Sequence, residues 1–315
     1  MKKLTILGGG TGMSQLLRGI KTFPFEISAI VAVSDDGKST GRLRREFNIP
    51  AIGDLRKVLV SLSEKEEIAE KLLDYRFNTN SDLDGHAVGN LLLAALADIN
   101  GSLSDGISDL DKVLNLKGKV IPLTEDNVVL MGKMEDGKIV RGEHSITEDN
   151  RLIDSVFYEK DPEVNKDALK AIKKANVIVL SSGSLYTSII PNLLCKEVKE
   201  EIDKSKAKII YVCNMMTQPG ETDGLSVSEH LKILNSYLGE RKVDAVIVNN
   251  GKVSSTTIEK YKTFEEKEPV LVDYDELKVM NVDVIEDNLT TIEDNYLRHN
   301  STKVALNIFS YLLDK

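Results

Sequence analysis

The sequence predicts a doubly wound α/β fold with a mostly parallel, Rossmann-like sheet. Short runs of β-branched and other apolar residues recur along the chain, at 4–7, 29–33, 177–180, 209–212 and 245–248. Each run is apolar throughout rather than alternating, which is typical of strands buried on both faces of a parallel sheet. Helical patterns separate the runs, and this alternation of strand and helix indicates the fold class. Ligands of such folds bind beyond the carboxyl ends of the strands.

One stretch departs from the alternation of strands and helices. Residues 119–147 are strand-rich, and a hairpin turn is expected at 135–137 because Glu-Asp-Gly separates two apolar runs there. We expect this stretch to be a small β-rich excursion from a single domain that covers residues 1–315. The helical patterns expected elsewhere lie at 14–20, 55–62, 68–75, 90–97, 168–174 and 226–238.

Composition excludes several classes of protein. The 315 residues include 41 Lys and Arg against 50 Asp and Glu, and the net charge of −9 disfavours general nucleic-acid binding. The longest apolar run, at 91–97, is far shorter than the roughly 18 residues that a membrane span needs. The two cysteines, Cys195 and Cys213, lie in apolar segments, which favours unpaired core thiols and a cytoplasmic protein.

A glycine-rich turn follows the first predicted strand. Gly9, Gly10, Thr11 and Gly12 stand between that strand and the helical pattern at 14–20. Glycines let the backbone approach a ligand closely, and a new helix presents free N–H groups to an anion. The segment therefore predicts a phosphate or pyrophosphate site, with a plain tight turn as the alternative. The dinucleotide fingerprint is met only in part, because Gln15 stands where the fingerprint has its last small residue.

Three carboxylates follow, two of them at the end of the second strand. Asp35 lies 23 residues after Gly12, close to where an acidic residue meets a ribose hydroxyl in Rossmann sites. Asp35 and Asp36 together have the oxygen ligands that suit Mg²⁺. A Walker A motif is excluded because Ala32 stands where its first glycine is needed. Asp54 is expected to be the N-cap of the helix at 55–62, and a role at the same site stays open.

A cluster of cations follows the two carboxylates. Lys38, Arg42, Arg44 and Arg45 lie within eight residues of one another. They suit contacts to a phosphate or carboxylate, and a solvated helix face is the alternative. Arg56 stands in the first turn of the next helix, where a cation is disfavoured unless an anion is near.

Two further segments open helices with polar side chains. His86 and Asn90 are four residues apart and share a face if both are helical, so they either meet a ligand or form a structural pair. No His or Cys spacing fits a zinc site. After the strand at 177–180, Ser184 and Thr187 provide hydroxyls beside another helix start. A serine hydrolase is excluded because Tyr186 replaces the last glycine of its nucleophile elbow.

The segment 213–222 follows the strand at 209–212. Asn214 and Gln218 have amide groups that suit recognition of a nucleobase or a sugar. Because this segment also lies at a strand's carboxyl end, we expect it to line the same cleft as the glycine-rich turn.

Taken together, these segments resemble the YvcK-like branch of the CofD family. The resemblance rests on segments in the same order along the chain, and it covers nearly all of it. It implies a Rossmann-like protein that binds a nucleotide-type ligand. CofD enzymes transfer a phospholactyl group with Mg²⁺, whereas the YvcK-like branch is associated with gluconeogenic growth, cell shape and UDP-sugar binding. One departure is Ser181-Ser182, where the family usually has Gly-Pro. The matching segments are 8–12, 34–42, 53–56, 85–90, 183–187, 214–222 and 296–299.

The leading hypothesis is a binding protein for a UDP-sugar such as UDP-N-acetylglucosamine, which couples carbon supply to cell-envelope synthesis. The turn at 9–12 and residues 184–187 would hold phosphates, and Asn214 and Gln218 would contact the base or sugar. Arg298 would add a counter-charge. Proteins of cell-envelope synthesis are the partners that this hypothesis implies, and a homodimer is expected only because dimers are common.

Two alternatives involve chemistry. In a phosphoester transferase, Asp35, Asp36 and Asp54 would place Mg²⁺, and His86 or Arg56 would stabilise developing charge. In an oxidoreductase, the turn at 9–12 and Asp35 would bind NAD, which is also able to occupy such a cleft without being a substrate. The oxidoreductase ranks last because the fingerprint is incomplete and no acid–base group is evident.

Overall fold

A seven-stranded parallel sheet forms the centre of the computed structural model, which describes residues 1–149, 151–293 and 296–314. Its strand order is β10–β9–β8–β7–β1–β2–β3, and every neighbouring pair runs parallel. The chain order reverses between β1 and β7, so this pair is the topological switch point at which doubly wound folds bind ligands. The strands are β1 (Lys2–Gly8), β2 (Phe25–Val31), β3 (Lys119–Pro122), β7 (Val177–Leu180), β8 (Lys208–Val212), β9 (Ala245–Asn249) and β10 (Asp283–Asp287).

The structure confirms the predicted α/β fold class and its five predicted strands. All four residues of β7 are buried, as expected for a strand covered on both faces. The two strands that the apolar runs did not reveal, β3 and β10, are the edges of the sheet. The β10 segment is Asp-Val-Ile-Glu-Asp, whose acidic residues suit an edge, because charges there discourage pairing with another chain.

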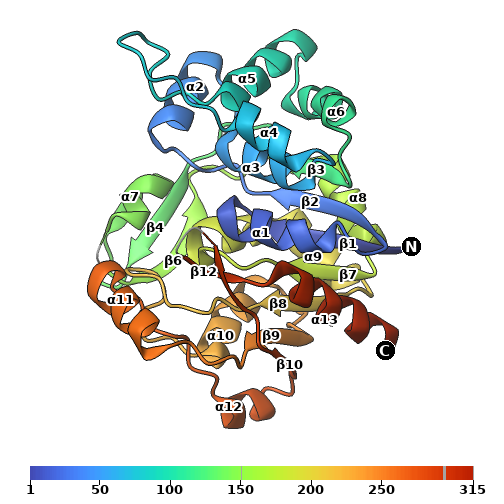
Figure 1. Ribbon diagram of the computed structural model, residues 1–315, viewed down its shortest axis with the longest axis vertical. Helices are drawn as coiled ribbons and strands as arrows, with labels where there is room; N and C mark the ends of the chain where they lie inside the picture. Colours follow the sequence, from blue (N-terminus) through green and yellow to red (C-terminus); the bar gives the residue numbers. More distant parts are fainter. Residues whose placement is uncertain (150, 294–295, 315) are drawn as a thin grey trace.

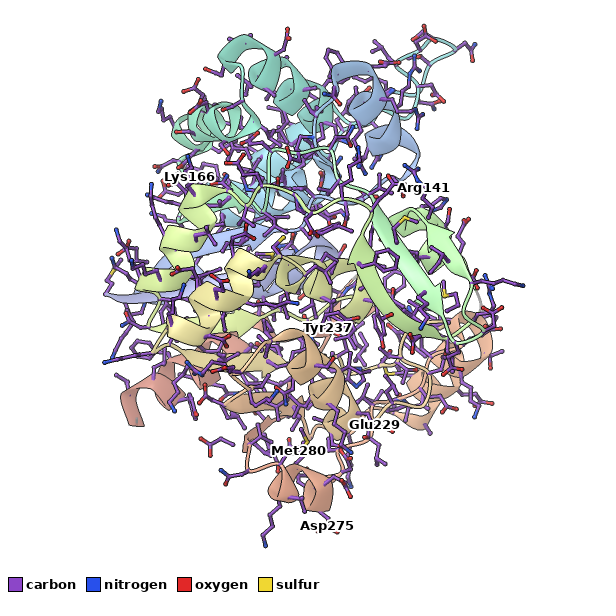
Figure 2. All side chains as sticks on the ribbon, turned by 180° about the vertical axis from the view of Figure 1, so that it is seen from behind. Arg141, Lys166, Glu229, Tyr237, Asp275 and Met280 are labelled. Carbon is purple, nitrogen blue, oxygen red and sulfur yellow. The ribbon has the colours of Figure 1, made fainter. Side chains whose placement is uncertain are left out.

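Helices cover both faces of the central sheet (Figure 1). On one face α1 (Gly10–Ile20) packs between α3 (Gly53–Leu62) and α13 (Ser301–Asp314). The opposite face carries α8 (Lys166–Lys174) and α9 (Lys196–Lys204), which Figure 2 shows from behind. The remaining helices are α2 (Lys38–Phe47), α4 (Glu66–Leu73), α5 (Val88–Asn100), α6 (Leu103–Leu114), α7 (Glu143–Thr147), α10 (Val227–Tyr237), α11 (Ser255–Glu265), α12 (Tyr274–Val279), η1 (Leu185–Ile189) and η2 (Ile190–Leu193).

A small antiparallel sheet stands beyond the carboxyl ends of the parallel strands (Figure 1). Its β4 (Leu130–Met134) and β5 (Ile139–Arg141) form the predicted hairpin, and β6 (Ile153–Tyr158) pairs with the other edge of β4. The predicted bounds of 119–147 were wrong at both ends. The first strand of that stretch is β3, whose buried apolar residues extend the main sheet beside β2, whereas β6 lies after residue 147.

The C-terminal part adds a hairpin of its own. Strands β11 (Thr290–Glu293) and β12 (Tyr296–His299) pair with each other and with no other strand that the structure describes. Both cysteines are free and buried, as predicted. Among the described residues, no helix is long and apolar enough to cross a membrane.

Candidate functional site

A cleft of about 340 Å³ opens at the carboxyl ends of β1, β7 and β8. The glycine-rich turn forms one side of it, and the loops after β7 and β8 form the other. The β11–β12 hairpin and α11 contribute further side chains. Eight of the predicted nucleotide-binding residues line this cleft: Gly9, Gly10, Thr11, Gly12, Ser184, Asn214, Gln218 and Arg298.

The glycine-rich turn leads directly into α1. Gly9 is the N-cap of this helix and has no side chain with which to cap it, and the first turn contains no acidic residue. Gly10 adopts a φ of +63°, a conformation that favours glycine. The Asp54 carboxylate faces this start and accepts from the Gly10 N–H, and Gly10, Thr11 and Gly12 all line the cleft. Such a helix start favours an anion.

Gly12 fixes how closely the turn packs against the loop after β7. A Cβ atom at this position would lie 2.2 Å from the carbonyl oxygen of Ser182 and 2.9 Å from the Cα of Gly183. Both contacts are with backbone, which no side-chain rotation relieves. Only glycine fits here, so the two loops form one continuous wall at the switch point.

Asn214 joins the loop after β8 to the loop after β7. Its Oδ1 accepts a hydrogen bond of 2.9 Å from the Gly183 N–H, and its Nδ2 donates one of 2.7 Å to the Gly183 carbonyl. We expected this amide to contact a base or sugar. The structure instead uses it to hold the turn at Gly183, whose φ is +136°. At Ser181 and Ser182 this chain departs from the family's Gly-Pro. These residues lead into a turn that Asn214, which follows the neighbouring strand, holds in place.

A buried carboxylate that the sequence analysis missed lies behind this wall. Glu221 accepts hydrogen bonds from the Ser184 hydroxyl at 2.5 and 2.7 Å and from the Tyr186 N–H at 3.2 Å. The Thr187 hydroxyl is 3.5 Å away, and the Gln218 amide donates at 2.9 Å. Burial raises the pKa of Glu221, and the donors from Ser184, Tyr186 and Thr187 oppose that rise. The hydroxyls of Ser184 and Thr187, which were predicted to hold phosphate, thus belong to a hydrogen-bond network around Glu221.

The β11–β12 hairpin brings a cation to the cleft. The guanidinium of Arg298 lies over the Tyr296 ring, 5.2 Å from its centroid, and it makes no ion pair with a carboxylate of the described residues. The imidazole Nε2 of His299 lies 3.0 Å from the Cys213 carbonyl, and burial lowers the His299 pKa to about 4. His299 therefore stays neutral near pH 7 and donates this hydrogen bond, which fixes the base of the hairpin.

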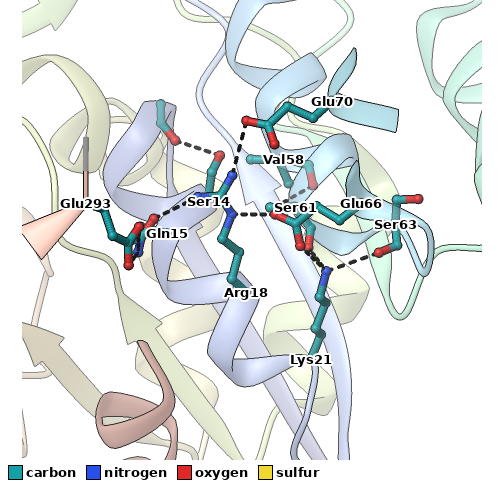
Figure 3. A network of polar contacts seen from close by, with 11 residues as sticks. Ser14, Gln15, Arg18, Lys21, Val58, Ser61, Ser63, Glu66, Glu70 and Glu293 are labelled. Carbon is teal, nitrogen blue, oxygen red and sulfur yellow. Dashed lines mark hydrogen bonds and ion pairs between the residues drawn. The ribbon is translucent and has the colours of Figure 1, made fainter. Parts of the chain in front are cut away.

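The hairpin is also tied to α1. Figure 3 shows the Gln15 amide donating to the Glu293 carboxylate, at 2.8 and 2.9 Å, and accepting from Arg18 at 3.0 Å. Arg18 in turn contacts Glu66 and Glu70 on α4. Since Gln15 itself lines the cleft, these contacts hold the hairpin and the helix that begins at the glycine-rich turn in a fixed relation.

Four carboxylates gather beside the glycine-rich turn, outside the cleft lining. The prediction that Asp54 is the N-cap of α3 was wrong. The helix starts earlier, so that Ile52 is its N-cap and Asp54 is its second residue. A Cβ at Gly9 would lie 2.8 Å from Asp54 Oδ2, so glycine is what lets this carboxylate approach. Asp36 accepts from the His144 N–H at 2.8 Å, and Asp35 accepts from the Gly37 N–H at 2.9 Å.

The fourth carboxylate, Glu143 on α7, is another residue that the sequence analysis did not single out. Burial and then the negative charges of Asp35, Asp54, Asp36 and Glu221 raise its pKa to about 8. The His144 N–H, one residue on, donates to Asp36, so α7 lies beside the loop after β2. Among the described residues, no group of three or more His, Cys, Asp or Glu side chains forms a metal site unaided.

The structure places the remaining candidates away from the cleft lining. Arg56 is buried, with its Nε 2.8 Å from Asp74 Oδ1 and its Nη1 donating to Asn90 Oδ1 at 3.2 Å. The anion expected near Arg56 is thus Asp74. His86 is buried as well. These residues connect α3, α5 and the end of α4, and the catalytic roles of Arg56 and His86 stay predictions.

Two arginines of the predicted basic cluster have different surroundings, and only Arg42 fits one of the two interpretations. Arg42 pairs with Glu46 at 2.8 Å on the surface, as on a solvated helix face. Arg44 is buried and donates to the carbonyls of Ser34 and Asp35 at 3.1 and 2.9 Å. Arg44 therefore shapes the loop that carries the carboxylates.

Fold and cleft together define a Rossmann-like α/β protein with a cleft at the switch point of its sheet. Residues 4–290 match the family model described as 2-phospho-L-lactate transferase CofD, and the chain belongs to this family. It is 48% identical over 305 residues to the gluconeogenesis factor of Halalkalibacterium halodurans, covering 96% of this chain and 94% of that protein. It is 44% identical over 304 residues to the gluconeogenesis factor of Bacillus subtilis, with 96% of both chains covered.

A solved structure agrees with these relatives. The crystal structure of a UPF0052 family member from Bacillus halodurans superposes with a TM-score of 0.94 at 48% identity, covering 98% of this chain and 99% of that one. The resemblance found in the sequence is therefore confirmed at the level of family and fold.

Proposed function

We propose that this protein is a cytoplasmic nucleotide-sugar-binding regulator that supports growth on gluconeogenic carbon sources and maintenance of cell shape. The regulatory part of the proposal follows from the relatives, which are called gluconeogenesis factors. The binding part rests on the cleft. One observation carries it: the glycine-rich start of α1 and the guanidinium of Arg298 line the same cavity in a chain whose net charge is −9.

A diphosphate suits this arrangement best. Its oxygens would accept hydrogen bonds from the first amides of α1 and pair with Arg298, since helix starts and guanidinium groups both favour phosphate. The acceptor-rich loops after β7 and β8 would then face the uncharged parts of the ligand. Glu221 already takes the donors of the η1 turn, so in this proposal the phosphates lie at 9–12 and not at 184–187.

Replacing Arg298 by alanine tests the charge. We expect the affinity for UDP-N-acetylglucosamine to fall by about tenfold or more, because one charge-assisted hydrogen bond is lost. Isothermal titration calorimetry measures the effect, and Lys196→Ala, an exposed cation on α9, is the matched control. Failure of the unaltered protein to bind this ligand at millimolar concentration would refute the proposal.

A second candidate function is a Mg²⁺-dependent transferase of a phosphorus-containing group. It is favoured by the description of the matching family model and by the carboxylates beside the turn. Mg²⁺ usually takes one or two protein carboxylates and completes its shell with phosphate oxygens and water, so a metal would need the ligand's phosphates here. The NAD hypothesis stays a prediction.

Metal-dependent turnover distinguishes the transferase from a protein that only binds. If Asp36 and Asp35 hold Mg²⁺, Asp36→Asn should lower Mg²⁺-dependent consumption of a nucleotide donor at least about tenfold, because a metal ligand loses its charge. The assay follows the donor by chromatography with and without Mg²⁺. Equal rates in both proteins, or no turnover with any donor, would count against this candidate.

A further inference from the structure

We propose that Glu221 sets the orientation of the Gln218 amide, so that this side of the cleft recognises a hydrogen-bond donor on the uncharged part of the ligand. The inference rests on the proposed function and deepens it, because it divides the cleft into a phosphate side and a donor-recognising side. The orientation of the Gln218 amide follows from the direction of each hydrogen bond around Glu221.

The Ser184 hydroxyl has no proton left for a ligand. In its ionised form Glu221 only accepts hydrogen bonds, so the single hydrogen of Ser184 then points to Glu221, at 2.5 Å from Oε2. The oxygen of Ser184 then accepts from the Thr187 N–H at 3.1 Å and from the Thr187 hydroxyl at 2.6 Å. Both hydroxyls of this turn, and the Tyr186 N–H, are thereby committed within the protein.

Glu221 fixes the orientation of the Gln218 amide in the same way. Its amide nitrogen is the only atom of the group that can donate, so the nitrogen faces Glu221 Oε1 at 2.9 Å. The carbonyl oxygen accepts no hydrogen bond from the described residues, and Gln218 lines the cleft. This oxygen is the acceptor that Gln218 presents to a ligand.

The burial of Glu221 stabilises the hydrogen bonds that it accepts. Glu221 is 4% exposed, and Ser184 and Gln218 stand between it and the cleft. A buried carboxylate that lost its donors would be left with an unpaired charge, which is costly. Glu221 is thus a positioning residue, and it acts on a ligand only through its neighbours.

The complementary chemical group is a donor that carries no charge. The hydroxyl or amide N–H groups of a sugar and the imide N–H of a pyrimidine base both fit, whereas a phosphate oxygen would be repelled by a carbonyl oxygen. Phosphate is therefore directed to the α1 side, where N–H groups and Arg298 meet it.

Three probes and two variants test the division. Calorimetric titrations would use pyrophosphate, UDP and UDP-N-acetylglucosamine with the unaltered protein, Gln218→Met and Glu221→Gln. Gln218→Met removes the acceptor and keeps an unbranched side chain of similar length. We expect it to weaken UDP-N-acetylglucosamine binding by about tenfold and pyrophosphate binding by less than about twofold. If Gln218→Met also weakens UDP binding, the donor lies on the base. If UDP binding is unchanged, the donor lies on the sugar.

Glu221→Gln keeps the shape of the side chain but adds a donor. Its amide nitrogen can now face the Gln218 carbonyl, which allows the Gln218 amide to turn and present nitrogen to the ligand. The affinity for the sugar nucleotide should fall by about tenfold again, with pyrophosphate binding retained. Glu200→Gln on the surface of α9 is the control, and thermal unfolding checks that each variant is folded.

The possible failures are distinguishable. If the unaltered protein binds none of the probes, the proposed function and this inference both fall. If it binds UDP-N-acetylglucosamine but Gln218→Met changes all affinities equally or changes none, the proposed function stands and the inference alone is overturned.

Discussion

Gly12→Ala is expected to abolish nucleotide-sugar binding. The added methyl group would meet the Ser182 carbonyl at 2.2 Å, so α1 and the loop after β7 must move apart. The N–H groups of α1 and the opposite wall would then no longer meet one ligand. Loss of two or more charge-assisted hydrogen bonds predicts at least about a hundredfold weaker binding in titration calorimetry.

The same substitution should also lower stability, since overpacking against backbone typically costs about 1–3 kcal/mol. Urea unfolding measures this cost and shows how much folded protein remains for the titration. Gly37→Ala is the matched control, because a Cβ there meets only the Asp35 carboxylate, at 3.2 Å, and the N–H that donates to Asp35 is kept. Binding by Gly12→Ala at the parent's affinity would show that the ligand does not use this junction.

The scaffold of the site was predictable because its signals are local. Apolar runs predicted the strands on both sides of the switch point, and glycines after β1 predicted the close approach that Gly12 makes. The spacing of segments after successive strands also predicted that 9–12, 184 and 214–218 would share one cleft. In each case the chemistry of a residue follows from its position at a strand's carboxyl end.

What the sequence did not reveal depends on contacts between distant segments. Ser184 suits a phosphate by its chemistry, and only the tertiary fold shows that Glu221, 37 residues away, already accepts the hydrogen bond of its hydroxyl. Asn214 was expected to be free for a ligand, but Gly183 uses it. Glu143 begins α7, a short helix beside the small sheet, and no local pattern encodes the place of this helix beside Asp36. A pattern indicates which groups are present, and the fold decides which of them remain free.

Glu143 itself gives the protein a stability that should depend on pH. The pKa of its folded-state carboxyl is about 8, against an ordinary value near 4.5. Between these values the folded state holds a proton that the unfolded state has released, so the free energy of unfolding falls as pH rises. For one such group the loss is about 1.4 kcal/mol per pH unit across the window, and below its lower limit this contribution is fully present.

Glu143→Gln should remove this dependence, because the amide is neutral at every pH. Urea unfolding at several values between pH 5 and pH 8, roughly the window that the two pKa values set, would show a shallower decline for the variant than for the parent, and higher stability at the alkaline end. Glu200→Gln, on exposed α9, should follow the parent. Parallel curves for parent and Glu143→Gln would mean that Glu143 is already ionised in the folded protein, and hence that the carboxylates around it do not act as one cluster.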